Sequence, residues 1–113
     1  MKIIVTTISL VELKTIAQER FGDMVKAVVD IEKKIMTVGG ELHADEEALL
    51  LDKGSKQNDL WGINIYPDQR RESWIEFDSM INIRPSLNNR TRNIESTTIR
   101  ERIAAIVNDL IHP

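Results

Sequence analysis

Two neighbouring stretches of the sequence alternate between apolar and polar residues. Residues 60–66 carry apolar side chains at positions 61, 63 and 65, and residues 74–84 carry them at 75, 77, 81 and 83. Side chains of a β-strand point alternately to its two faces, so each stretch predicts a strand with one apolar face. The charged connection at 68–72 has the length of a hairpin loop, which predicts that the two strands pair antiparallel.

Helical periodicity flanks these strands on both sides. Residues 10–21 repeat apolar side chains every three or four positions, Ser9 begins a capping box, and Gly22 suits the end of a helix. Residues 99–110 carry a second apolar stripe, with Ser96 or a neighbouring threonine as its cap. Two helices are therefore predicted, one near each end of the chain.

Residues 24–38 fit a helical stripe and a strand alternation equally well. The density of β-branched residues and the Gly39–Gly40 pair that follows favour strands. We predict a hairpin of strands 25–31 and 34–38 that turns near Glu32 and Lys33. The short apolar run at 48–51 is either a strand or a brief helix.

These elements predict one α+β domain over residues 1–113, since a chain of this length has room for a single domain. We expect a mostly antiparallel sheet of four or five strands in meander order, with an N-terminal and a C-terminal helix. The strand–helix alternation that a parallel sheet needs is missing. The residues expected to face the helices from the sheet are Trp61, Ile63, Ile65, Ile75, Phe77, Ile81 and Ile83.

Composition excludes several classes of function. The chain has no cysteine, which removes disulfides, thiolate catalysis and cysteine-based zinc sites. Its net charge of −3 disfavours nucleic acid as a partner. No apolar run is long enough to cross a membrane, and the first residues are too short an apolar run for a signal peptide. We therefore expect a cytoplasmic protein with no membrane association.

Three stretches of the sequence together carry a resemblance to a known family. They are Gly39-Gly40-Glu41-Leu42-His43-Ala44-Asp45-Glu46-Glu47, Gly54-Ser55-Lys56-Gln57 through Leu60-Trp61-Gly62, and Ile81-Asn82-Ile83-Arg84-Pro85 with Asn89-Arg90. Together they resemble a small prokaryotic family of unknown function, found in bacteria including cyanobacteria, over about residues 24–111. The resemblance implies a glycine, suited to a turn, where this chain has Lys34. It implies no reaction, ligand or partner.

His43, Asp45 and Glu47 stand at every second position of a polar stretch. On a strand they would share one face, and on a helix His43 and Glu47 would do so. A carboxylate beside an imidazole tunes it as a general base, so we predict these three as catalytic residues. A purely local role also fits, because Asp45 suits a helix cap and the glutamates suit its first turn. We predict no metal and no cofactor, because the only other histidine, His112, lies next to the end of the sequence.

A basic and amide-rich segment follows the last predicted strand. Residues 84–92 carry three arginines and no acidic residue. Guanidinium forks and amides bind carboxylates and phosphates, so we predict a ligand-binding role for Asn82, Arg84, Asn89 and Arg90. The alternative is that this segment is a solvated loop, in which the arginines pair with the acidic residues of 72–78.

The function that follows is binding of an anionic small molecule, or of an acidic group of a partner, between the two polar clusters. One alternative is a homodimer or protein-interaction module that uses a sheet face bearing Trp61 and Trp74. Another is a hydrolase with His43 as base, so whether the chain is an enzyme stays open. None of the common nucleotide, dinucleotide or hydrolase motifs is present. A pocket shared by the two clusters would favour ligand binding or hydrolysis, and a flat apolar face would favour association.

Overall fold

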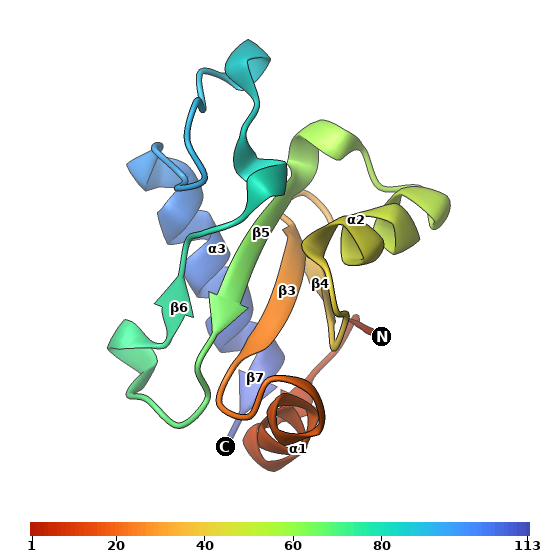
Figure 1. Ribbon diagram of the computed structural model, residues 1–113, viewed down its shortest axis with the longest axis vertical. Helices are drawn as coiled ribbons and strands as arrows, with labels where there is room; N and C mark the ends of the chain where they lie inside the picture. Colours follow the sequence, from red (N-terminus) through yellow and green to blue (C-terminus); the bar gives the residue numbers. More distant parts are fainter.

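The computed structural model describes residues 1–113 as an α+β fold with three helices and a five-stranded antiparallel sheet (Figure 1). The strands of this sheet are β1 (Lys2–Ile4), β3 (Val25–Asp30), β4 (Ile35–Val38), β5 (Leu60–Ile65) and β6 (Ile75–Glu76). A separate parallel pair joins β2 (Ile8–Ser9) to β7 (Ile111–His112). The helices are α1 (Leu10–Arg20), α2 (His43–Asp52) and α3 (Thr97–Leu110), and 3-10 turns occupy Gln57–Asp59, Arg71–Ser73, Met80–Asn82 and Pro85–Leu87.

The strand order is β1-β4-β3-β5-β6, so the predicted meander order is wrong. The central strand is β3, with β4 paired on one side and β5 on the other. The chain therefore passes from β4 through α2 to the opposite side of β3 before it enters β5. The first helix is the one predicted at 10–21, but two short strands precede it. A connection that passes from one side of β3 to the other produces no hydrophobic periodicity and no turn signal in the sequence, so these signals did not predict the strand order.

Capping side chains begin the two outer helices as predicted. The Ser9 hydroxyl accepts a hydrogen bond from the Glu12 backbone N–H at 3.1 Å, and the Ser96 hydroxyl accepts one from the Ile99 N–H at 3.2 Å. Gly22 follows α1 with a φ of +94°, the left-handed conformation that ends many helices. The run at 48–51, left open between strand and helix, lies within α2. None of the helices is both long and apolar enough to cross a membrane.

The hairpin predicted within residues 24–38 is confirmed by β3 and β4. In its turn the Asp30 carboxylate accepts hydrogen bonds from the N–H groups of Glu32 at 3.0 Å and Lys33 at 2.9 Å. Lys34 has a φ of +57°, the left-handed region that only glycine enters without strain. This is the position at which the family resemblance implies a glycine.

Both faces of the sheet are covered. The main core lies between one face and helices α1 and α3, and a smaller cluster of Val28, Leu50 and Leu60 lies under α2 on the other face. Figure 1 shows α3 behind the central strands and α2 in front of them. Trp61 and Trp74 are each only 1% exposed within the main core. The sheet face on which the association hypothesis relied is therefore buried within this chain.

The strand predicted at 74–84 extends over only Ile75–Glu76. Beyond it the Ser79 hydroxyl caps the 3-10 turn Met80–Asn82, and the Asn82 side chain takes the place of a paired strand. The Asn82 amide accepts from the Gly62 N–H at 2.8 Å and donates to the Gly62 carbonyl at 2.9 Å. Ile83, predicted to be buried, is 39% exposed as a result. Ile81 packs on the α2 side of the sheet instead of the main core.

Candidate functional site

The two polar clusters predicted from the sequence meet over β5. The Arg84 guanidinium donates to a Glu47 carboxylate oxygen at 2.7 Å and also to the backbone carbonyl of Leu60. The two side chains are only 9% and 13% exposed, and the guanidinium lies 5.4 Å from the Trp61 ring. Burial lowers the pKa of Arg84 from its ordinary value, although Glu47 opposes that effect. The charge of Arg84 is thus balanced within the chain, and it fastens α2 to β5.

The side chains of Asn82 and Asn89, the two amide residues of the predicted site, form hydrogen bonds to backbone groups of this chain. Asn82 bonds to Gly62 as described, and Asn89 is 3% exposed. The Asn89 amide nitrogen donates to the carbonyl of Asn82 at 2.7 Å, and its oxygen accepts from the Glu95 N–H at 2.8 Å. Both side chains therefore shape the segment between β6 and α3. A ligand-binding role for them stays a prediction.

Asp45 and Arg90, two further predicted residues, lie at the surface. Asp45 is exposed in the first turn of α2, and the helix is preceded by Leu42 as its N-cap, so Asp45 is not the cap. Arg90 is exposed, and its backbone N–H donates to the Glu95 carboxylate at 2.7 Å. The structure therefore does not bring all seven predicted residues into one pocket.

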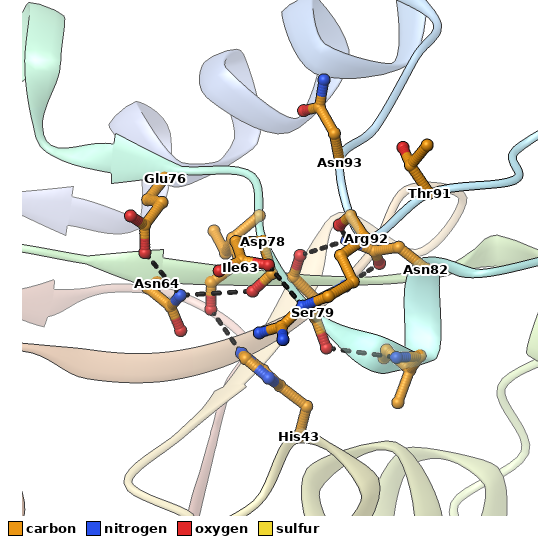
Figure 2. A network of polar contacts seen from close by, with 12 residues as sticks. His43, Ile63, Asn64, Glu76, Asp78, Ser79, Asn82, Thr91, Arg92 and Asn93 are labelled. Atoms are coloured by element: carbon orange, nitrogen blue, oxygen red, sulfur yellow. Dashed lines mark hydrogen bonds and ion pairs between the residues drawn. The ribbon is translucent and has the colours of Figure 1, made fainter.

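His43 is the predicted site residue that borders a hollow. It is the first residue of α2, and its Nε2 lies 2.8 Å from the backbone carbonyl oxygen of Ile63 (Figure 2). A carbonyl oxygen only accepts hydrogen bonds, so Nε2 carries the proton. Burial lowers the pKa of His43 below 6.5, and the nearby charge of Lys26 acts in the same direction. The imidazole is therefore neutral at pH 7, with Nδ1 as its basic nitrogen.

The hollow beside His43 has a volume of about 400 Å³. Its floor is a row of polar side chains from three adjacent strands, in which Lys26 of β3 stands opposite Asn64 of β5, and Asn64 stands opposite Glu76 of β6. The other residues around it are Met24, Leu42, Ala44, Asp78, Ser79, Met80, Ile81 and Arg92. The sequence analysis did not predict this row. One signal for it was present, because Asn64 lies between Ile63 and Ile65, and strand alternation places its side chain on the face opposite theirs.

Hydrogen bonds order the floor of the hollow. The Asn64 amide nitrogen donates to the Glu76 carboxylate at 2.8 Å and to the Asp78 carbonyl at 3.2 Å, as Figure 2 shows. The Tyr66 hydroxyl donates to the same Glu76 oxygen at 3.3 Å, and burial together with Glu76 raises the pKa of Tyr66. The Asn64 amide oxygen is buried and has no partner. These bonds leave one polar atom of the floor unsatisfied.

The charges around the hollow are unevenly paired. Arg92 donates to the Asp78 carboxylate at 2.7 Å, whereas none of the six ion pairs in the structure includes Lys26. The Lys26 ammonium lies 5.2 Å from the centre of the Phe21 ring. No group of three or more His, Asp or Glu side chains is placed to hold a metal ion. The hollow is therefore lined by Lys26, whose ammonium has no ion-pair partner, and by the neutral imidazole of His43.

A family model described as a protein of unknown function (DUF5674) matches residues 2–110 of this chain. The chain belongs to the DUF5674 family. The match covers the five-stranded sheet, all three helices and the residues that line the hollow beside His43. No curated protein and no solved structure matches the chain.

Proposed function

We propose that this DUF5674 domain binds a small molecule through an anionic group in the hollow between α2 and the sheet. The observation that carries the proposal is Lys26, which lines a cavity of about 400 Å³ and whose ammonium has no carboxylate partner. Ligand pockets commonly combine such a volume with a few convergent polar groups. An ammonium without a partner attracts an anion more strongly than one already neutralised by a carboxylate.

His43, which lines the same hollow, is the proposed acid–base residue. Its Nε2–H is held by the Ile63 carbonyl, which leaves Nδ1 able to accept a proton or a hydrogen bond. Glu47 and Arg84 are proposed as positioning residues, because their ion pair fastens the helix that begins with His43 to β5. The cysteine-free composition supports a cytoplasmic location.

Titration of the ¹⁵N-labelled protein with sodium acetate and sodium phosphate, followed by NMR, tests this proposal. We expect at least one anion to shift the backbone signals of Lys26, His43 and Asn64 in a saturable manner. The variant Lys26→Met should lose these shifts, because it keeps the aliphatic part of the side chain and removes the charge.

A control variant separates this site from general charge effects. Lys56→Met removes one exposed positive charge outside the hollow and should leave the titration unchanged. Saturable shifts that survive in Lys26→Met, or the absence of saturable shifts with either anion, would refute binding at this site.

A further inference from the structure

The polar floor of the hollow is bordered by apolar side chains, two of which are exposed to solvent. Met80 is 65% exposed and Leu42 is 53% exposed, and both line the hollow together with Met24 and Ile81. Leu42 precedes α2, whereas Met80 belongs to the 3-10 turn after β6. Two segments 38 positions apart in the sequence thus each supply an apolar residue to the same opening.

Leu42 is also unfavourable for the helix that it begins. It occupies the N-cap position of α2 and makes no side-chain capping hydrogen bond. Serine, asparagine and aspartate are preferred at this position because their side chains satisfy a free N–H of the first turn, and leucine is among the poorest choices. The chain therefore keeps a solvent-exposed leucine where a polar residue would make a more stable helix.

Met80 is held in place by the turn around it. The Ser79 hydroxyl accepts a hydrogen bond from the Ile81 N–H at 3.3 Å, and Asn82 is bound to Gly62 at the other end of the turn. The thioether side chain itself is flexible and adapts its shape to apolar partners. An adaptable side chain on a fixed turn suits contact with an aliphatic chain.

We infer that the ligand is an aliphatic monocarboxylate, whose carboxylate lies at Lys26 and whose hydrocarbon chain covers Leu42 and Met80. This inference rests on the proposed anion-binding function and adds the class of molecule. The unpaired ammonium supplies the charge complementarity, and the exposed border supplies apolar area that a ligand removes from water. Neither Glu76 nor Asp78 forms an ion pair with the ammonium, since Asp78 pairs with Arg92 and Glu76 accepts hydrogen bonds from Asn64 and Tyr66.

A series of acetate, butyrate, hexanoate and octanoate, titrated by the same NMR method, tests the inference. Each methylene group buried against the border should lower the dissociation constant about fourfold, until the chain outgrows the hollow. Leu42→Ser and Met80→Ser should reduce this dependence on chain length and leave acetate binding unchanged. Val11→Ser, which changes an exposed valine on α1, is the matched control and should keep the dependence.

Leu42→Ser has a second readout that a structural role would not produce. It should raise the thermal unfolding midpoint, since serine caps α2 better than leucine, and weaken hexanoate binding in the same protein. A variant that loses both stability and binding would show that Leu42 serves the fold, and would overturn its assignment to the ligand.

The outcomes separate this inference from the proposed function. Acetate binding with no gain along the series overturns the aliphatic ligand and keeps the anion site. If phosphate binds and none of the carboxylates does, the aliphatic ligand is likewise overturned and the anion site is kept. Tighter binding of N-acetyl-Ala-Leu than of hexanoate would identify a peptide carboxyl terminus instead. If no anion binds, both proposals fail.

Discussion

Glu46 makes the stability of this domain depend on pH. Its side chain is fully buried in the first turn of α2, where one carboxyl oxygen accepts the Gly40 N–H at 3.0 Å and the other has no partner. Burial raises the pKa of Glu46 from 4.5 to about 8, even though the Gly40 N–H and Lys26 oppose the rise. Glu46 is therefore mostly protonated at pH 7 in the folded state and ionised in the unfolded state.

The sign and size of the effect follow from this difference. Between pH 4.5 and about 8 the folded state holds a proton that the unfolded state has lost, so the stabilising contribution is complete below pH 4.5 and is lost as the pH rises to about 8. A rise of the pKa from 4.5 to about 8 corresponds to about 5 kcal/mol in total. Between pH 5 and pH 9 the free energy of unfolding should fall by about 4 kcal/mol through this group alone.

The substitution Glu46→Gln isolates this contribution. Glutamine keeps the acceptor for the Gly40 N–H and does not ionise, so the difference in unfolding free energy between variant and parent should shift by about 4 kcal/mol in favour of the variant from pH 5 to pH 9. Urea denaturation followed by the fluorescence of Trp61 and Trp74 measures it. Asp52→Asn, at an exposed carboxylate in the last turn of the same helix, is the control and should keep the parental pH dependence. If Glu46→Gln also keeps it, the reasoning about the buried carboxyl is refuted.

Two further substitutions test how the chain is held together. Asn82→Ala should lower the free energy of unfolding by about 2–4 kcal/mol, because it leaves the buried N–H and carbonyl of Gly62 without partners; a loss no larger than that of the exposed Asn58→Ala would contradict this. Lys34→Gly should raise the free energy of unfolding by about 0.5–1 kcal/mol by relieving the left-handed conformation, whereas Lys33→Gly in the same turn should not, and thermal denaturation of both variants decides the point.

Local signals in the sequence predicted those elements whose cause is local. The helix at 10–21 and the strand at 60–66 combine a clear period with caps or turn residues, and both are present. The hairpin within 24–38, where the period is ambiguous, is present as the β-branched residues and the Gly39–Gly40 pair predicted. The stretch 74–84 shows the same period but is not a strand beyond Glu76, because Asn82 replaces strand pairing by a side-chain contact to a residue 20 positions away. The sequence carries no periodic signal for such a contact.

The candidate site was predictable only in part for a similar reason. The contact between the acidic and basic clusters follows from charge, and the Glu47–Arg84 ion pair realises it. Lys26, Asn64 and Glu76 are each ordinary polar positions of separate strands, and only the register of β3, β5 and β6 places them in one row. The strand order that creates this row could not be derived from periodicity, because it depends on the path of the chain through α2.

The Asn82 and Arg84 side chains, which hydrogen-bond to the backbone of β5, also limit where a strand of another molecule can add to the sheet. A strand edge with free N–H and carbonyl groups is a template on which a strand of another molecule can add, and this is a common route to aggregation. Along β5 the short strand β6 takes the groups near Ile65, while Asn82 and Arg84 take those of Gly62 and Leu60. A foreign strand would have to displace a buried amide and a buried guanidinium from this edge. Breaking these contacts costs free energy, and this cost protects the domain from strand addition and fibril formation at the edge that lies on the same side as the hollow.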